Sequence, residues 1–500
     1  MALGVTAPAE RSDRGGRAVL LLLGIIVLAA ILRFWRLGDW GFESTELFTL
    51  RDSNNPRLNN PRPIIYFLNY FLIRPLGPLN ELGLRILPAL FGVLAVPAMY
   101  FLGRRVVGSR AALFSGLLLA VSGSHIYYSQ FARYWSLVFL LSAIYPIAIY
   151  IGVRERSRPA LVLGLVTAIL AVLSHPVSIL LFGSLGIWVL GMYFRRGQLR
   201  QLWSQKGARW GMLVGLAMVA AIATRYVPML RSWVSMHDKG PAGEFLLLLP
   251  TGMGLKQMSY LLAYAESLTL PVVLAGLVGI YHLWRRDRSL GLLMACLALF
   301  PVAFLLLVSL RTSISLPYLL MPSAPAFFYG AGVFLDSLTQ VEWGVRPRWL
   351  IPATMVIIVL TAGAPTVMSQ YRDGRRYDFR RVAEWLNGEM RPGDRIFSDQ
   401  PRVLMHYLPG SEIPRLTRDT VALARSKESV EAAGKEGALW IVAPAPSHAF
   451  RSAPGLGRLN NWMYHNCQIR NTVGVGRLDF RQHYLQIYRC PPFPVSQPES

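Results

Sequence analysis

The sequence predicts an α-helical polytopic membrane protein with about eleven transmembrane helices and a small C-terminal extracytoplasmic α/β domain. Of its 500 residues, 53% are hydrophobic and only 16% are charged. Soluble domains carry charges on about a quarter of their residues, so this low charge content indicates long segments in lipid. The placement of arginine supports the same fold class, because basic turns recur between the apolar segments.

Eleven segments are long enough to cross a hydrocarbon core of about 30 Å, which takes about 20 apolar residues per helix. The first, "AVLLLLGIIVLAAILRFW", follows the basic stretch "RSDRGGR", and no small-residue cleavage site comes after it. We therefore interpret it as a retained anchor and not as a signal peptide. The segments lie at residues 17–34, 83–103, 111–128, 134–152, 159–175, 177–194, 210–226, 268–284, 289–309, 316–336 and 349–368.

The basic turns also predict the orientation of the chain. With a cytoplasmic N-terminus, every short turn that the eleven segments place inside is basic, as the positive-inside rule requires. The outer face then holds the loops at residues 35–82 and 227–265 and the whole C-terminal region. The inside turns contain Arg104, Arg105 and Arg110; Arg154, Arg156 and Arg158; residues 195–209; Arg285, Arg286 and Arg288; and Arg346 and Arg348.

The net charge of +24 raises the question of a nucleic-acid partner. The spans exclude a soluble nucleic-acid binder, and much of the excess charge lies in the inside turns, where it orients helices. Other arginines lie near the outer boundary, where basic side chains favour anionic headgroups. They indicate a lipid phosphate or diphosphate site, or else ordinary snorkelling. They are Arg33, Arg36, Arg51, Arg57, Arg62, Arg74, Arg85 and Arg133.

Residues 369–500 have the mixed pattern of an extracytoplasmic α/β domain, separate from the membrane domain at residues 1–368. "DFRRVAEWLNGEMRPGDRIFSD" predicts a helix, a turn and a strand, "GALWIVAP" and "HYLQIYRC" predict further strands, and residues 419–437 predict a helix. Cys467 and Cys490 lie in this region and could form a disulfide in an oxidising compartment. Cys296 lies in a span and is interpreted as a packing residue. No Walker loop, GxGxxG motif or zinc-type Cys/His spacing is found.

Three stretches of the sequence resemble a known family: "LRFWRLGDWGFESTELFTL", "RPIIYFLNYFL" and the long block from "LRILPALF" to "SHIYYSQFARYWSLVFLLSA". They resemble the polytopic GT-C glycosyltransferases, in particular the bacterial protein-mannosyltransferase-like and aminoarabinose-transferase-like enzymes. The resemblance implies that a sugar passes from a polyprenyl-phosphate donor to a lipid, glycan or protein acceptor outside the cytoplasm, with inversion. It also implies a bacterial inner or plasma membrane.

The resemblance further implies that an acid of the first external loop acts as general base. The family pattern is an Asp-Glu pair followed by a small residue, an aromatic residue and Thr. Set against "STELFTL", the Glu falls on Glu46, but the Asp position holds Thr45. A threonine hydroxyl cannot serve as a base near neutral pH. We therefore assign the catalytic role to Glu46 and Glu43, with an ordinary loop acid as the alternative for Glu43.

A second departure lies in "SHIYYSQFARYW", where Phe131 occupies a position that relatives fill with Glu. A missing acid weakens the argument for Mg²⁺ or Mn²⁺ between the loops, because both prefer carboxylate oxygens. No metal ligand is assigned, and a divalent cation stays an open alternative. The resemblance implies substrate-binding roles for Tyr66, His125, Tyr128, Gln130, Arg133 and His175. Arg62 stands where relatives carry His, and we assign it with Arg133 to the donor phosphate. The alternatives are polar tips facing water for His125 and His175 and an interfacial aromatic belt for Tyr128.

The two departures leave alternatives to the enzyme. A GT-C-like lipid-binding or assembly subunit without catalysis would keep the lipid groove and lose the acids. A transporter would need charged residues at midspan or a broken-helix repeat. For the enzyme, the predicted partners are the polyprenyl-phosphate-sugar lipid, an extracytoplasmic acceptor and the membrane.

Overall fold

The computed structural model describes residues 8–195, 252–309, 316–340, 350–392, 394–398, 400–411, 413, 438–444, 467–474 and 484–490. The chain divides into two compact units. The first comprises residues 1–35, 53–76 and 85–364, and the second comprises residues 36–52, 77–84 and 365–500. Each unit is described by itself.

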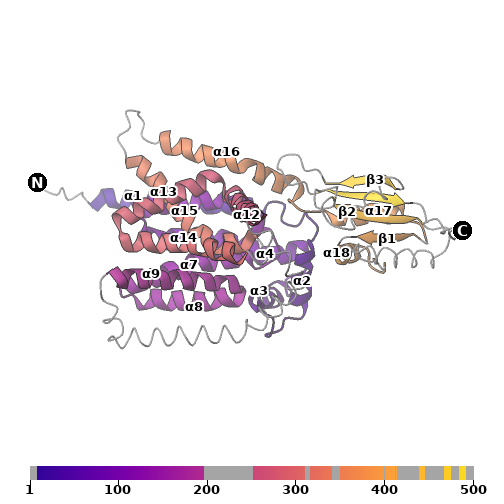
Figure 1. Cartoon of the computed structure of the whole chain (residues 1–500), viewed down its shortest axis with the longest axis horizontal. Coiled ribbons are helices and arrows are strands. Elements are labelled where there is room, and N and C mark those ends of the chain that lie inside the picture. Colours follow the sequence, from indigo (N-terminus) through magenta and orange to yellow (C-terminus); the bar gives the residue numbers. More distant parts are fainter. Residues whose placement is uncertain are drawn as a thin grey trace, which may run out of the picture. The chain divides into compact units, whose positions relative to one another are not determined.

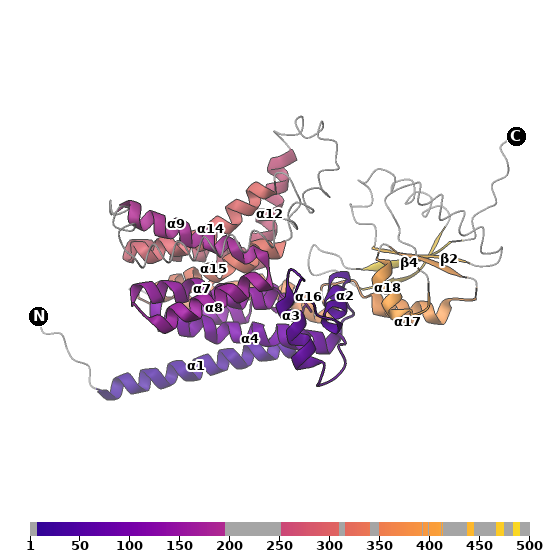
Figure 2. The same cartoon turned by 90° about the horizontal axis from the view of Figure 1, so that it is seen from below.

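The first unit is built from α-helices, with α7, α8, α9 and α14 running alongside one another (Figures 1 and 2). Its helices are α1 Pro8–Phe34, α3 Pro63–Leu68, the π-helical turn η1 Asn69–Ile73, α4 Glu81–Val106, α5 Ser109–Ala120, α6 Gly123–Ser129, α7 Trp135–Arg154, α8 Arg158–Ser174, the 3₁₀ turn η2 Pro176–Ile179, α9 Leu180–Arg195, α12 Gly252–Leu268, α13 Leu270–Arg286, α14 Arg288–Val308, α15 Leu316–Gln340 and α16 Leu350–Asp373. Helices α4 and α16 continue into the second unit.

Ten of the eleven predicted spans coincide with described helices, and the segment 210–226 lies outside the described residues. Six helices are long and apolar enough to cross a membrane, or eight if the bent pairs α5–α6 and α12–α13 each form one span. Helices α8 and α9 are apolar but shorter. Most residues of the apolar stretches of α7 and α15 are buried within the protein, whereas most of those of α1 are not and are available to lipid.

Helix α13 crosses α15 at very close range. A Cβ atom placed on Gly279 would lie 1.8 Å from the carbonyl oxygen of Gly330, and one on Gly276 would lie 2.9 Å from that of Phe327. Small residues allow helix backbones to approach in this way, since lipid gives apolar side chains no reason to prefer each other. At the N-terminal end of α13 the chain bends by 91° from α12, with Thr269 at a φ of 67°. The described part of the predicted 227–265 loop is therefore mostly helix α12.

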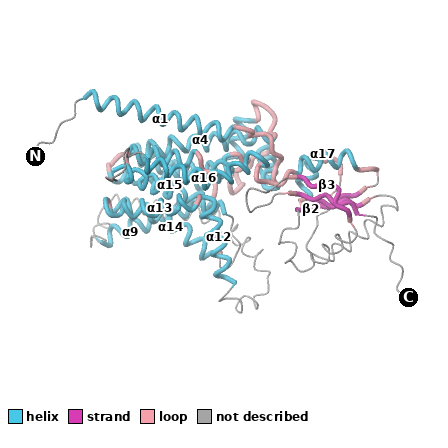
Figure 3. The backbone as a smooth tube through the Cα atoms, turned by 90° about the horizontal axis from the view of Figure 1, so that it is seen from above, coloured by secondary structure: helices cyan, strands magenta, loops and turns pink. Residues whose placement is uncertain are grey.

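The second unit contains a four-stranded sheet in the order β1-β2-β4-β3 (Figure 3). Strand β1 Arg395–Ser398 pairs in parallel with β2 Leu439–Pro444, while β4 Leu485–Cys490 is antiparallel to both β2 and β3 Gln468–Val473. Helix α17 Phe379–Glu389 and helix α18 Pro401–Tyr407 bury Leu386, Val403 and Leu404 in a core shared with Trp440 and Ile487. Helix α2 Ser44–Asn54 begins in this unit.

The sequence predicted several elements of this unit. Helix α17 and strands β1, β2 and β4 are confirmed, and Cys467 and Cys490 form a disulfide. Strand β3 and helix α18 were not predicted, because β3 is mostly exposed and α18 spans only seven residues. The predicted helix at residues 419–437 lies outside the described residues.

Candidate functional site

Two arginines of the first unit share one tyrosine ring. The guanidinium carbon of Arg62 lies 5.1 Å from the centroid of the Tyr134 ring, and that of Arg133 lies 4.7 Å from it. Arg133 also donates to the Tyr134 hydroxyl at 3.0 Å. Arg62 precedes helix α3, whereas Arg133 and Tyr134 form the turn between α6 and α7. The electron-rich Tyr134 ring attracts both guanidinium groups through cation–π contacts.

His175 joins this cluster from the end of α8. Its ring packs against Tyr134 at 5.0 Å, Trp135 at 4.8 Å and Tyr318 at 5.1 Å between centroids. The His175 Nδ1 accepts the backbone N–H of Val177 at 3.1 Å. A neutral imidazole that accepts at Nδ1 carries its proton on Nε2, so the second nitrogen is a donor.

The cluster holds hydrogen-bond donors without acceptors. In the described part of the chain, the buried Nε of Arg62 and Nε2 of His175 have no hydrogen-bond partner. The charged groups that interact electrostatically with His175 are the guanidiniums of Arg62 and Arg133. Buried polar atoms without partners are rare in folded proteins, and an unseen water or ligand is one of the reasons for them. Two cations and an imidazole donor make a site that is suited to an anion.

His125 and Gln130 lie in a different hydrogen-bond network, which supplies donors to the carbonyl oxygens at helix ends. Arg33 is fully buried, and its guanidinium donates to His125 Nδ1 at 2.8 Å and to the carbonyl oxygen of Ala120, the last residue of α5, at 2.9 Å. Gln130 Nε2 donates to the carbonyl oxygen of Trp35 at 2.9 Å, just after α1. The last carbonyls of a helix lack partners within it, and basic or amide side chains supply them. These contacts tie α6 to α1 and α5.

Phe131 follows α6 and packs against two aromatic side chains of that helix. Phe131 stacks on the ring of Tyr127 at 5.6 Å between centroids and meets Tyr128 edge-on at 6.5 Å. Tyr128 is buried, and so is Tyr66 on α3. Phe131 is therefore part of an aromatic contact.

The two loop acids lie in the second unit. Glu46 occupies the first turn of α2, and its Oε2 accepts the backbone N–H of Glu43 at 2.9 Å and an Nη1–H of Arg376 at 3.1 Å. Both side chains of this ion pair are fully buried. Glu43 is half-buried, and Thr45 is exposed. Arg376 escaped the sequence analysis because nothing in its surroundings connects it with residue 46.

Further contacts fasten the first loop within the second unit. The Tyr407 hydroxyl accepts the backbone N–H of Phe42 at 2.6 Å and donates to Glu81 Oε1 at 2.7 Å. Arg380 lies 3.8 Å from the same carboxylate oxygen and also donates to the carbonyl oxygen of Asp39. The beginning and the end of the loop predicted at residues 35–82 are therefore held by side chains that follow α16.

The donor set of the cluster does not fit a divalent metal. Mg²⁺ and Mn²⁺ prefer carboxylate oxygens, whereas Arg62, Arg133 and His175 offer cations and an imidazole donor. Among the described residues, no group of three or more His, Cys, Asp or Glu side chains could hold a metal ion.

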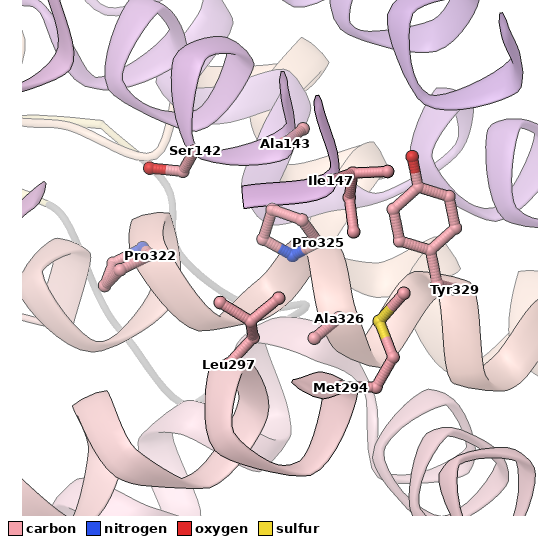
Figure 4. A pocket seen from close by; sticks show the side chains of 9 residues that line it. All are labelled: Ser142, Ala143, Ile147, Met294, Leu297, Pro322, Pro325, Ala326 and Tyr329. Carbon is pink, nitrogen blue, oxygen red and sulfur yellow. The ribbon is translucent and has the colours of Figure 1, made fainter. Parts of the chain in front are cut away.

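Two hollows in the first unit lie away from the cluster. A cavity of about 10 Å³ between α7, α14 and α15, drawn in Figure 4, has room for about one water and none for a sugar. A polar hollow of about 270 Å³ lies at the C-terminal end of α7, where Arg154 pairs with Asp287 at 2.5 Å and Arg105 pairs with Glu155. The anion-suited cluster adjoins the opposite end of α7.

No protein-family model matches the chain, and a search of curated proteins gives no significant match. Solved structures do match. ArnT from Cupriavidus metallidurans in the apo state has a TM-score of 0.53 at 15% identity, over 95% of this chain and 98% of that one. ArnT bound to undecaprenyl phosphate has a TM-score of 0.50 at 15% identity, over the same shares of both chains.

An oligosaccharyltransferase from Archaeoglobus fulgidus, in complex with Zn and sulfate, has a TM-score of 0.53 at 13% identity, over 85% of this chain and 68% of that one. Both neighbours are GT-C glycosyltransferases. The chain has the GT-C fold. Together with its apolar helices, this GT-C fold makes the chain an integral membrane protein.

Proposed function

We propose that this chain is a membrane glycosyltransferase that moves a sugar from a polyprenyl-phosphate donor to an acceptor outside the cytoplasm. The observation that carries the proposal is the cluster of Arg62, Arg133 and His175, which presents unsatisfied donors and positive charge on a GT-C fold. A donor phosphate supplies the anionic oxygens that such a cluster requires. The structural neighbour ArnT bound to undecaprenyl phosphate adds support from the same fold.

In the proposed reaction the oxygen of an acceptor hydroxyl attacks the anomeric carbon of the donor sugar. A new C–O bond forms there while the bond from that carbon to the phosphate oxygen breaks, with inversion at the carbon. The bonding electrons leave with the polyprenyl phosphate, and the hydroxyl proton passes to a loop carboxylate, Glu46 or Glu43. A positioned base of this kind contributes about 10²–10⁴-fold to the rate.

The arginines have a defined part in this reaction. Arg62 and Arg133 hold the phosphate in the ground state and stabilise the charge that it gains as the sugar leaves. His175 donates from Nε2 to the same group, and Tyr66 and Tyr128 are assigned to contacts with the sugar. His125 and Gln130 act through α6, whose ends they fasten.

The proposed orientation places the N-terminus in the cytoplasm and the C-terminal region outside. The support comes from helix α7, which is about 30 Å long at 1.5 Å per residue. Its Trp135 end adjoins the anion-suited cluster, whereas its Arg154 end lies among the arginine turns that the positive-inside rule assigns to the cytoplasm. A donor site at the outer end then fits an external acceptor.

The experiment is transfer of radiolabel from a panel of polyprenyl-phosphate sugars by the purified protein in nanodiscs. We expect at least one donor to lose its sugar in an acceptor-dependent reaction, and Arg133→Ala to slow it. A protein that binds the donors and consumes none, with any acceptor tried, would instead be the silent lipid-binding or assembly subunit. Phe131 and the buried ion pair of Glu46 are the observations that favour this second candidate.

A further inference from the structure

The second unit contains an ion pair between residues that lie far apart in the chain. Glu46 and Arg376 meet at 3.1 Å, and neither side chain is exposed to solvent. Two charges that are removed from water depend on each other, and the loss of one partner leaves the other buried and alone. Arg376 therefore fixes the carboxylate of Glu46.

The same carboxylate oxygen fixes the backbone of Glu43. Glu43 precedes the first residue of α2, and its carbonyl oxygen accepts the N–H of Glu46 at 2.9 Å. In return, Glu46 Oε2 accepts the N–H of Glu43 at 2.9 Å. The bond from the Glu46 side chain is one arm of a capping box, which gives a partner to a backbone N–H at the start of the helix. The position of Glu43 thus depends on Glu46.

Arg376 is itself held by a turn that only glycine permits. Its Nε donates to the carbonyl oxygen of Gly374 at 3.1 Å, and Gly374 has a φ of +70°. A Cβ atom on Gly374 would lie 2.5 Å from the Trp40 ring. Glycine alone adopts this conformation without a steric penalty and leaves room for the ring. The arginine is thereby presented to Glu46 from a fixed backbone.

Burial separates the two acids. A base must come within about 2.6–3.2 Å of the proton that it takes. Glu46 is fully buried and its Oε2 is shared by two donors, whereas Glu43 is half-buried. We propose that Glu46 and Arg376 form a positioning pair, and that Glu43 supplies the carboxylate that takes the acceptor proton. This proposal rests on the proposed function and reverses the order of the two acids that the family pattern implies.

The test uses four variants of the full chain in nanodiscs. Glu43→Gln removes the proposed base and keeps its backbone N–H. Glu46→Gln and Arg376→Met each leave one member of the pair alone. The double variant Glu46→Gln/Arg376→Met removes both charges, and its amide oxygen can still accept the N–H of Glu43. Arg381→Met is the matched control, because the exposed side chain of Arg381 also pairs with an acid, Asp378, at 3.3 Å.

We expect Glu43→Gln to lower kcat/KM by about 10²–10⁴-fold, with donor binding and thermal midpoint unchanged. Arg376→Met should lower both kcat/KM and the thermal midpoint, and the double variant should recover at least tenfold in kcat/KM and most of the midpoint. The acid limb of the pH profile should persist in the double variant, because Glu43 is still present. Arg381→Met should behave as wild type.

Two results would overturn the proposal. A double variant with the wild-type midpoint and no turnover would make Glu46 the base, and full activity in Glu43→Gln would exclude Glu43. Failure of the proposed function looks different, since the wild type then consumes no donor. In that case Glu43 has no catalytic role. The Glu46–Arg376 pair is tested separately, by whether the double variant melts at a higher temperature than both single variants.

Discussion

At the scale of residues, the contacts of each arginine in the first unit show whether it caps a helix, pairs with an acid or is available to bind an anion. Arg33 donates hydrogen bonds to the carbonyl oxygens at the end of a helix, and Arg154 is paired with the carboxylate of Asp287. Arg62 and Arg133 instead lie on an aromatic ring beside an imidazole donor. The sequence placed Arg33, Arg62 and Arg133 together as outer arginines, and only their contacts separate helix capping from anion binding.

Arg133→Ala should weaken the binding of polyprenyl phosphate by about 10- to 100-fold. A hydrogen bond to a charged group contributes about 1.5–3 kcal/mol, and about 1.4 kcal/mol corresponds to a factor of ten. Titration of labelled polyprenyl phosphate into nanodiscs measures the change. Arg74→Ala is the control, because Arg74 is exposed and also lies over a tyrosine ring, Tyr70, at 5.0 Å. Equal losses in both variants would contradict the assignment.

Asp394 should make the second unit sensitive to acid. Burial acts to raise the pKa of Asp394, but hydrogen bonds from Trp440 Nε1 and from the backbone N–H groups of Arg391 and Ala438 lower it below its ordinary value of 3.8. A lowered pKa in the folded state contributes stability above the ordinary value, and this stability is lost as the pH falls through the folded value. Thermal midpoints at a series of pH values should show wild type above Asp394→Asn near neutrality and the difference shrinking in acid. A difference that is constant with pH would contradict this account.

The residues that the sequence missed were missed for a physical reason. The family resemblance pointed to Glu46 and His175, and the placement of arginines near the outer boundary pointed to Arg62 and Arg133, because both kinds of evidence follow the order of residues along the chain. They carry no information on a pair such as Glu46 and Arg376, whose members are brought together only by folding. Contacts between distant segments thus remained outside the reach of the sequence.

At the scale of elements, apolar length predicted the helices well, because lipid requires a continuous run of such residues. The breaks between helices were harder to predict from the sequence. The segment 111–128 was predicted as one span, but α5 and α6 meet at 63°, and Arg33 fills the gap with donors to the carbonyls of α5. Strand β3 was missed because "QIRNTV" alternates poorly and has one buried residue, Val473.

The crossing of α13 and α15 should tolerate no side chain. Gly279→Ala places a methyl group 1.8 Å from the carbonyl oxygen of Gly330, so the helices must separate. Overpacking of this kind costs about 1–3 kcal/mol or more. The thermal midpoint in detergent should fall for Gly279→Ala and stay unchanged for Gly186→Ala, since no atom lies within 4 Å of a Cβ on Gly186. An unchanged midpoint for Gly279→Ala would contradict the close crossing.

At the scale of the whole molecule, the account depends on the orientation of the chain in the membrane. Ser109 is the first residue of α5, next to a turn predicted inside, and Asn59 lies in the loop predicted outside; both are exposed. Cys296 is buried and the other two cysteines form a disulfide, so a new cysteine can be labelled selectively. In intact cells a membrane-impermeant maleimide should label Asn59→Cys, and should label Ser109→Cys only after permeabilisation. The reverse pattern would place the anion-suited cluster on the cytoplasmic side.

The most direct measurement of the central claim is photo-crosslinking with a polyprenyl phosphate that carries a diazirine next to the phosphate. If Arg62, Arg133 and His175 hold that phosphate, the label should appear in peptides that contain Tyr134, Trp135 or His175. Unlabelled polyprenyl phosphate should compete with the probe, whereas the uncharged polyprenol should not. Labelling confined to other helices, or equal competition by the polyprenol, would contradict a phosphate site at this cluster.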